Sequence, residues 1–585
     1  MWYRATLIAI GLAWCLAGVR NTPASQPIVI VKNGSYAGIH SETYNQDWFL
    51  GIPYAQPPIK DLRFRVPRHL EDSWVGPRDA KRYSPACVGY GGDEVHYDRL
   101  SEDCLYLNVL RPAGYGNNKL PVAFWMHGGG FFQGSTMDKR YNLCFIIQQS
   151  VEIGKPMIGV SINYRISAWG FLLGKEVQDS GQSNLGLRDQ RLAMQWVQEN
   201  INAFGGDSNK VTVWGESAGA SSVGNHIIAY NGRDDKLFRA GIMQSGGPIF
   251  YYPMTAKQSY FDLLLSSVGC DTSKDKIQCL RTLPFSVLNA AINTTEDLTQ
   301  RWHPVVDGDL ITKRPSKLLA ADIFNKVPVI VGANSDEGSI FSPRQVNTEE
   351  DFYNHLIHNS SFTPFFAAKI PSGFATRVLK VYPDIPELGI PGPPTLAYNV
   401  RPAPRFGAQF RRSSAYYGDA IFVAPRRQTC AVWASSGVPA YCYRFNTIPA
   451  GVPPEIASTH FQEIAFVMQN RIDGGQGYYM PPVPPFMGKP DSFTSLSKVM
   501  GKSWISFVVD LDPNSWKKTN RDDWWKPGPK GPREDTPIWP QYQLDTPLDI
   551  VWDANVTALA FLEKDTYRGE AMELINSAAA TVFDR

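Results

Sequence analysis

A serine framed by two glycines is the residue of this chain whose type and setting most clearly suggest chemistry. Ser217 lies in Gly-Glu-Ser-Ala-Gly, directly after the strand-forming residues Val211–Trp214. A strand that leads into Gly-x-Ser-x-Gly and then into a helix is typical of a nucleophile elbow, a sharp turn that exposes one hydroxyl. Glycine at 215 and 219 suits this turn because a side chain there would clash. The pentapeptide alone is common by chance, so its strand–turn–helix context is what favours a nucleophilic serine.

A nucleophilic serine needs a general base to take its proton. In hydrolases built on such an elbow, the base is a histidine that follows both the serine and the acid in the chain. His355, His358 and His460 satisfy this order. The first two lie in a polar segment that is typical of a solvated surface. His460 follows a predicted strand and a Pro-rich loop and precedes an apolar helix, so we predict that it is the base.

The third partner is a carboxylate that orients the histidine and stabilises its charged form. The predicted strand Val327–Gly332 leads into Ala-Asn-Ser-Asp-Glu-Gly, which offers Asp336 and Glu337. Asp307 and Asp309 lie before this strand. Chemistry alone leaves Asp336 and Glu337 both open.

A glycine run is the candidate oxyanion hole, which needs backbone N–H donors near the reacting carbonyl oxygen. Met126-His-Gly-Gly-Gly-Phe131 follows the predicted strand Pro121–Met126, and consecutive glycines let a backbone approach the substrate closely. Ala218, directly after the nucleophile, supplies a further N–H. We expect His127 to shape this loop rather than act as a base. A phosphate-binding interpretation is disfavoured because no Lys-Ser/Thr pair follows the glycines.

Alternating strands and helices must position these residues. The apolar, β-branched runs that predict buried strands are 105–110, 121–126, 157–164, 211–214, 240–244, 327–332 and 438–445. The clearest helix is Asp189–Ala203, with Asp189 near its start and Gly205-Gly206 at its end. This order predicts an α/β fold with a large, doubly wound, mostly parallel sheet, whose active site lies beyond the carboxyl ends of the strands.

The rest of the chain reads as additions to this sheet. Pro- and Gly-rich stretches at 371–394, 480–490 and 526–537 predict surface loops, and residues 345–425 predict a helical flank. None of the loops resembles an interdomain linker. We therefore expect one domain over residues 26–575.

Composition excludes some partners. Lys+Arg is 57 and Asp+Glu is 55, so the formal charge of +2 gives no electrostatic basis for binding nucleic acid. The chemistry described above implies no metal and no cofactor, and it implies a small-molecule ester as the partner.

The N-terminus predicts export. Residues 1–20, with Arg4 before an apolar run, are typical of a signal peptide cleaved between about residues 17 and 25, and the run is too short for a stop-transfer helix. An N-terminal anchor is the alternative. Sequons at Asn33, Asn293, Asn359 and Asn555 favour an extracellular location. The C-terminal residues carry neither a retention tetrapeptide nor an apolar anchor tail.

The motifs together resemble the type-B carboxylesterase/lipase family, which includes cholinesterases and fungal lipases. Phe204–Gly219 resembles its serine signature, and Glu102-Asp-Cys-Leu-Tyr-Leu-Asn-Val109 resembles its second signature. Matching segments lie between about residues 28 and 570. The phrases Gly159–Arg165 and Thr459–Ala465 are most similar to secreted fungal members.

The resemblance implies roles that the residues alone leave open. It implies an α/β-hydrolase fold with Ser217, Glu337 and His460 as the catalytic residues. It assigns the oxyanion N–H groups to Gly129, Gly130 and Ala218.

The resemblance also implies covalent and ionic links. It pairs Cys87 with Cys104 and Cys270 with Cys279, and it places a buried ion pair on Arg63 and Glu102. Cys144, Cys430 and Cys442 have no partner by resemblance. A Cys430–Cys442 bond is conceivable, and geometry decides it.

One departure from the lipases bears on the substrate. Their first disulfide loop carries a long amphipathic lid, whereas the loop Val88–Asp103 has only 16 residues and is polar. The expected activity is therefore a secreted carboxylesterase acting on soluble or dispersed esters. The alternatives are an interfacial lipase, a transacylase that uses the same acyl-enzyme, and a non-catalytic binding module. The intact catalytic set argues against the last.

Overall fold

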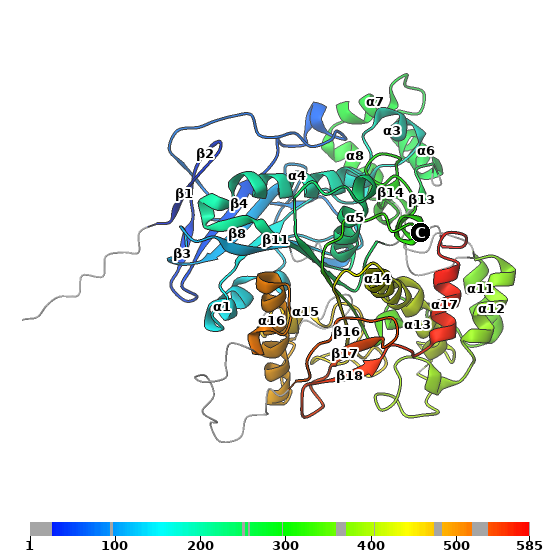
Figure 1. Cartoon of the computed structure of the whole chain (residues 1–585). Helices are drawn as coiled ribbons and strands as arrows, with labels where there is room; N and C mark the ends of the chain where they lie inside the picture. The colour runs from blue at the N-terminus through cyan, green and yellow to red at the C-terminus, as the bar shows by residue number, and fades with distance from the viewer. Residues whose placement is uncertain are drawn as a thin grey trace, which may run out of the picture.

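A large mixed sheet dominates the computed structural model, which describes residues 26–93, 97–248, 252–255, 258–294, 296–358, 370–402, 404–472, 483–517 and 536–583. Its eleven described strands lie in the order β18-β17-β16-β15-β12-β11-β9-β10-β8-β4-β3 (Figure 1). The central strands of this order, from β17 through β9 to β10, pair in parallel. The pairs at both edges, β18 with β17 and β10 with β8, β8 with β4 and β4 with β3, are antiparallel. The predicted fold class, an α/β-hydrolase sheet with helices on both faces, is confirmed.

All seven predicted strands are present in this sheet. They are β8 (Tyr106–Pro112), β9 (Leu120–Met126), β10 (Ile158–Ile162), β11 (Gly206–Glu216), β12 (Ala240–Gln244), β15 (Val329–Asn334) and β16 (Ala440–Phe445). The pattern missed the edge strands β3 (Ile39–Ser41), β4 (Gln46–Pro53), β17 (Leu548–Trp552) and β18 (Ala560–Lys564). The outermost strands β3 and β18 are only partly buried and carry a weak hydrophobic signal, whereas β4 and β17 are mostly buried but have polar or small residues in their runs, Asp47 and Gly51 in β4 and Asp549 in β17. Small separate sheets join β1 (Ile28–Val31), β2 (Gly34–Ala37) and β5 (Pro77–Asp79), β6 (Ala86–Cys87) and β7 (Leu100–Ser101), and β13 (Tyr252–Pro253) and β14 (Val305–Val306).

Both faces of the sheet are buried. In β9, Val122, Phe124 and Met126 belong to one core cluster, and the alternate residues Ala123 and Trp125 belong to another. Successive side chains of a strand point to opposite faces, so each cluster marks one face. The first face is covered by α4 (Leu185–Asn200) and α5 (Ala218–Gly232), and the second by α1 (Cys144–Glu152) and α16 (Asp491–Asp510) (Figure 1).

The helix predicted at 189–203 is longer at its start than expected. α4 begins at Leu185 and ends at Asn200, and a 3-10 turn continues to Phe204. Asp189 therefore lies inside the helix, where its buried carboxylate accepts hydrogen bonds of 2.8 and 2.7 Å from the Arg165 guanidinium. The prediction that the helix begins at Asp189 was wrong, because the helix begins at Leu185 and Asp189 instead forms an ion pair with Arg165.

The predicted helical flank forms its own core beside the sheet. It contains α11 (Glu349–His358), α12 (Ser372–Val381) and α13 (Phe410–Gly418), with α17 (Gly569–Ser577) and the first residue of α14 (Ala424–Ser435) packed against it. The remaining described helices are α2 (Ser167–Phe171), α3 (Lys175–Ser180), α6 (Gln258–Ser267), α7 (Lys276–Thr282), α8 (Phe285–Ile292), α9 (Glu296–Gln300), α10 (Pro315–Ala320) and α15 (Ile464–Val467).

Three disulfides link the described residues. Cys87–Cys104 and Cys270–Cys279 form as the resemblance implied, and Cys430–Cys442 joins α14 to β16. Cys144 is buried in α1 and belongs to no disulfide. The expected ion pair is also present, with Arg63 Nε and Nη2 donating to the two Glu102 oxygens at 2.6 and 2.8 Å.

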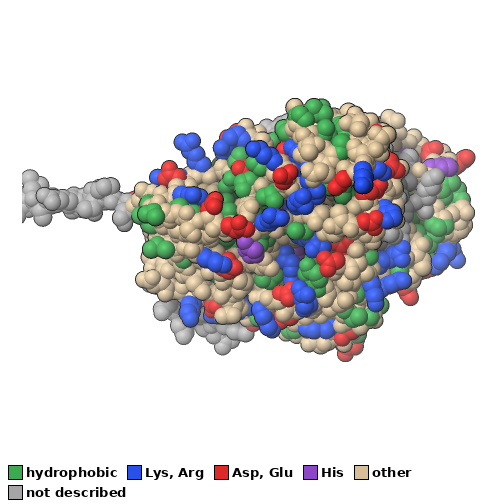
Figure 2. All heavy atoms as spheres, turned by 90° about the horizontal axis from the view of Figure 1, so that it is seen from above, with side chains coloured by type: hydrophobic (Ala, Val, Ile, Leu, Met, Phe, Trp, Pro, Cys, Tyr) green, Lys and Arg blue, Asp and Glu red, His purple; other side chains and the backbone are tan. Residues whose placement is uncertain are grey.

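The surface shown in Figure 2 carries interspersed basic and acidic side chains rather than a field of one sign, in keeping with the formal charge of +2. Within the described ranges, no helix has the length and apolar character needed to cross a bilayer. The same ranges contain no cluster of His, Cys, Asp and Glu suited to holding a metal ion.

Candidate active site

Ser217 occupies a strained turn between β11 and α5. Its backbone has φ 56° and ψ −121°, a conformation that a non-glycine residue rarely adopts. The Ser217 N–H donates to the carbonyl of Gln244 in β12 at 2.8 Å, which fixes the turn to the neighbouring strand. A Cβ on Gly219 would lie 2.1 Å from the Met126 carbonyl oxygen, so glycine is required where α5 meets the end of β9. The predicted elbow geometry is therefore present.

Glu337 follows β15 in a short 3-10 turn, Glu337–Ser339, and contacts the predicted base. Its Oε2 lies 2.7 Å from His460 Nδ1. Its Oε1 accepts hydrogen bonds from the Asn334 N–H at 2.7 Å and from the Ser245 hydroxyl at 2.5 Å. These donors stabilise a carboxylate that is fully buried. The arrangement orients the imidazole and leaves its Nε2 toward the elbow.

The other candidate acids, Asp336 and Asp307, form hydrogen bonds with residues other than the histidine. Asp336 Oδ2 accepts from the Ser458 N–H at 3.1 Å, and the Asp336 N–H donates to the Ser458 carbonyl at 2.9 Å. Burial raises the pKa of Asp336 to about 7. Asp307 instead accepts from Ser183 and Asn184. Among the candidate acids, the structure therefore brings Glu337 to the histidine.

His460 is held by aromatic side chains as well as by Glu337. Its ring stacks on Phe422 with centroids 4.4 Å apart, and Phe341 meets it edge-on at 5.2 Å. His460 Nε2 lies 3.2 Å from Glu216 Oε1 and makes no hydrogen bond to Ser217. Catalytic hydrogen bonds of this kind are often long without substrate and tighten in the reacting complex. His355 and His358 lie in the last turn of α11, away from this arrangement.

Two further glutamates, which the sequence reasoning missed, complete the polar surroundings of the histidine. Burial and the neighbouring carboxylates of Glu463 and Glu337 raise the pKa of Glu216 well above its usual value. Burial also raises the pKa of Glu463, whose oxygens accept from Gln244 Nε2 at 3.1 Å and Asn334 Nδ2 at 2.7 Å. Their signal in the sequence is position, because one directly precedes Ser217 and the other follows His460 by three residues.

The glycine run lies against the elbow, as an oxyanion loop requires. A Cβ on Gly128 would lie 3.1 Å from Ser217 Cβ, so the loop touches the nucleophile. Gly129 and Gly130 have φ of 98° and 61°. The N–H groups of Gly129, Gly130 and Ala218 donate to no other described residue. They are therefore available to a bound oxygen.

His127 is part of the support for this loop. It stacks on Tyr164 at 4.4 Å, and its Nδ1 lies 2.9 Å from the Gly128 carbonyl. The Tyr164 hydroxyl donates to the His127 carbonyl at 2.8 Å. Burial lowers the pKa of His127 to about 4, so the ring is neutral at pH 7.

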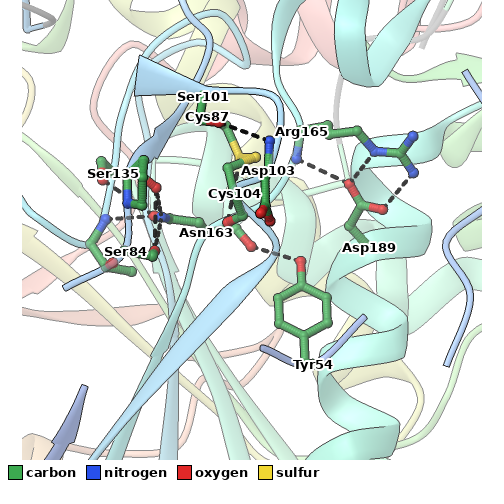
Figure 3. Close-up of a disulfide and its surroundings, with 12 residues drawn as sticks. Tyr54, Ser84, Cys87, Ser101, Asp103, Cys104, Ser135, Asn163, Arg165 and Asp189 are labelled. Atoms are coloured by element: carbon green, nitrogen blue, oxygen red, sulfur yellow. Dashed lines mark hydrogen bonds and ion pairs between the residues drawn. A yellow bond between two sulfur atoms is a disulfide. The ribbon is translucent and has the colours of Figure 1, made fainter. Parts of the chain in front are cut away.

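The first disulfide loop is fastened to the oxyanion loop. The Tyr90 N–H donates to the Phe132 carbonyl at 2.8 Å, and Arg140 Nη2 lies 2.9 Å from Asp93 Oδ1. Figure 3 shows Asn163 near Ser84, which precedes the disulfide loop, and Ser135, which follows the glycine run, and its side chain forms hydrogen bonds with both. The disulfide Cys87–Cys104 lies beside this network (Figure 3).

Comparison with known proteins defines the class. The model of the carboxylesterase family matches residues 25–552, so the chain belongs to that family. A curated secreted lipase of Botryotinia fuckeliana is 33% identical over 536 residues, covering 86% of this chain and 87% of the relative. A secreted triacylglycerol lipase of Gibberella zeae is 34% identical, covering 72% and 75%. The crystal structure of Aspergillus niger EstA superposes with a TM-score of 0.77 at 27% identity, covering 94% and 98%. The protein is an ester hydrolase of this family.

Proposed function

We propose that the chain is a secreted serine carboxylic-ester hydrolase in which Ser217, His460 and Glu337 act as nucleophile, base and acid. The observation that carries the proposal is the 2.7 Å contact between His460 Nδ1 and Glu337 Oε2 beside the strained elbow. Family membership supports the reaction class. The strand ends supply all three groups from distant parts of the chain.

The mechanism transfers the acyl group in two steps. His460 Nε2 takes the Ser217 proton as the hydroxyl oxygen attacks the ester carbonyl, and Glu337 stabilises the imidazolium. The N–H groups of Gly129, Gly130 and Ala218 receive the oxyanion. The imidazolium then protonates the leaving alcohol, and water attacks the acyl-enzyme by the same route. Loss of one donor in a comparable oxyanion hole costs about 10²–10³ in rate.

We further propose that the substrates are soluble or dispersed esters. Support comes from the short, polar sequence of the disulfide loop and from the attachment of its first residues through Tyr90 and Asp93 to the segment after the glycine run. The competing candidate is an interfacial lipase, and it is favoured by the names of curated relatives, among them the two secreted lipases described above.

Export is the second part of the proposal. The signal segment and Asn359 lie outside the described residues, so support comes from the names of the secreted relatives and from the disulfides. Asn293 and Asn555 are exposed, which suits glycosylation. Asn33 is half-buried, and its amide donates to the carbonyls of Leu70 and Asp72. We propose one domain over residues 26–575, since the described elements pack around a common sheet.

A 4-nitrophenyl ester series from acetate to palmitate, measured with wild type and Ser217→Ala, tests the proposal. We expect the variant to lose at least about 10³-fold in kcat while remaining folded. Equal rates in the two proteins would refute the role of Ser217. Wild-type activity that rises sharply when tributyrin exceeds its solubility would replace the soluble-ester assignment with the interfacial lipase.

A further inference from the structure

Two arginines lie close together one side-chain layer from the catalytic histidine. Phe341, which meets the His460 ring edge-on, also packs against a small cluster of Ile340, Phe406, Phe410 and Ile456. The Arg344 guanidinium lies over both phenylalanine rings of this cluster, 5.1 Å from the Phe406 centroid and 5.0 Å from the Phe410 centroid. Arg405 lies over Phe406 at 4.6 Å. The two cations therefore share one aromatic ring.

These two arginines lack the acidic partner that their neighbours have. Arg401 pairs with Asp384 at 2.7 Å, and Arg412 pairs with Glu349 at 3.1 Å. Among the described residues, no carboxylate lies within 4.0 Å of Arg344 or Arg405. Arg344 Nη1 donates to the Ser339 carbonyl at 2.9 Å, and most of its other donors have no acceptor among the described residues.

The placement of the pair is fixed by the backbone. The Gln345 N–H donates to the Phe406 carbonyl at 3.1 Å, and the Gln409 N–H donates to the Val346 carbonyl at 2.9 Å. These bonds hold the segment after Glu337 against the segment before α13. Burial and the charge of Arg405 lower the pKa of Arg344 to about 10, so Arg344 remains cationic at pH 7. Two like charges held together without a counter-charge favour an added anion.

We propose that Arg344 and Arg405 form a subsite for a carboxylate carried by the ester substrate, beside the aromatic cluster that Phe341 joins to His460. The inference rests on the proposed function, because it places the reacting ester at Ser217. Arg344 is half-buried and offers a planar fork of donors suited to a carboxylate, while exposed Arg405 adds charge at the rim. The subsite would favour monoesters of dicarboxylic acids over neutral esters of equal length.

Matched substrates separate the subsite from the chemistry. The mono-4-nitrophenyl esters of glutaric and suberic acid are compared with 4-nitrophenyl pentanoate and octanoate at pH 7, and the readout is the ratio of kcat/KM, charged over neutral. We expect Arg344→Gln to lower this ratio about tenfold through KM, and Arg405→Gln to lower it less. Arg344→Lys should retain part of the preference, and added salt should reduce it in wild type.

Arg377→Gln is the matched control. Arg377 is exposed, as Arg405 is, lies over a phenylalanine ring at 5.8 Å and is distant in the chain from the subsite. The subsite is overturned if the ratio in Arg344→Gln stays within twofold of wild type, or if Arg377→Gln lowers it equally.

Calorimetric titration with suberate tests the subsite without turnover. Binding to wild type that weakens in Arg344→Gln supports the subsite, and equal binding or none in the two proteins overturns it. Failure of the proposed function has a separate signature, because wild type would then hydrolyse neither the charged nor the neutral esters.

Discussion

At the scale of single residues, the choice of acid depends on which carboxylate reaches the imidazole. Asp336 and Glu337 are adjacent in the chain, yet only Glu337 contacts His460, while Asp336 bonds to the backbone of Ser458. Adjacent residues point in different directions, and the local turn decides which one enters the site. The motif alone contains both carboxylates and cannot distinguish their directions.

Neutralising each acid in turn tests this assignment. We expect Glu337→Gln to lower kcat by about 10²–10⁴, since the amide favours the wrong imidazole tautomer and cannot stabilise its charge. Asp336→Asn should retain kcat within about tenfold. The measurement is kcat for 4-nitrophenyl butyrate, with circular dichroism to confirm folding. The reverse order of effects would assign the acid to Asp336.

At the scale of elements, the disulfide Cys430–Cys442 fastens the helical flank to the sheet. Cys430 lies in α14, Cys442 lies in β16, and both are fully buried. The family resemblance had left these cysteines unassigned. Their pairing follows from the docking of α14 on β16, which is a tertiary contact without a signature in the sequence.

Replacing both cysteines by alanine should destabilise the fold. We expect a loss of about 2–4 kcal/mol in the free energy of unfolding, because the unfolded chain regains the freedom that the cross-link removed. Urea titration measures the loss. Cys144→Ala is the control, since it removes a buried thiol without removing a cross-link. An equal loss in the control would show that packing, not the disulfide, supplies the stability.

At the scale of the whole molecule, buried titratable groups make stability depend on pH in opposite directions. Burial lowers the pKa of His226 to about 3, and its Nε2 lies 2.9 Å from Gln190 Oε1. Below pH 6.5 this histidine is protonated in the unfolded chain but stays neutral in the folded chain. The free energy of unfolding therefore rises with pH in this range. Asp336 acts oppositely. Its raised pKa keeps a proton on the folded chain between about pH 4 and 7, and stability falls with pH across that window.

Variants should therefore change the pH slope of stability with opposite signs. Between pH 4.5 and 6.5, His226→Gln should make the free energy of unfolding rise with pH by about 1–3 kcal/mol less than in wild type. Asp336→Asn should make it rise more, by a similar amount, because the variant lacks the opposing contribution of Asp336. Urea midpoints at pH 4.5, 5.5 and 6.5 give the slopes. Changes of the same sign in the two variants would contradict the assigned pKa directions.

The sequence by itself determined the local parts of this protein. The elbow, the glycine run, the buried strands and the order of Ser217 and His460 depend on backbone preference, periodicity and chain order, all of which act over short distances. The outermost strands β3 and β18 escaped prediction because they bury little, and β4 and β17 because polar or small residues interrupt their apolar runs. The start of the helix was wrongly predicted at Asp189, because the ion-pair partner of this residue, Arg165, lies outside the helix and is not visible in the local pattern.

Only the tertiary structure decided which distant side chains meet. It brought Glu337 rather than Asp336 into contact with His460, placed Glu216 and Phe422 beside the imidazole, and paired Cys430 with Cys442. It also brought Arg344 and Arg405 over one ring. The physical reason is that these contacts join segments separated by many residues, so they depend on how sheet and helices pack, which no local pattern records.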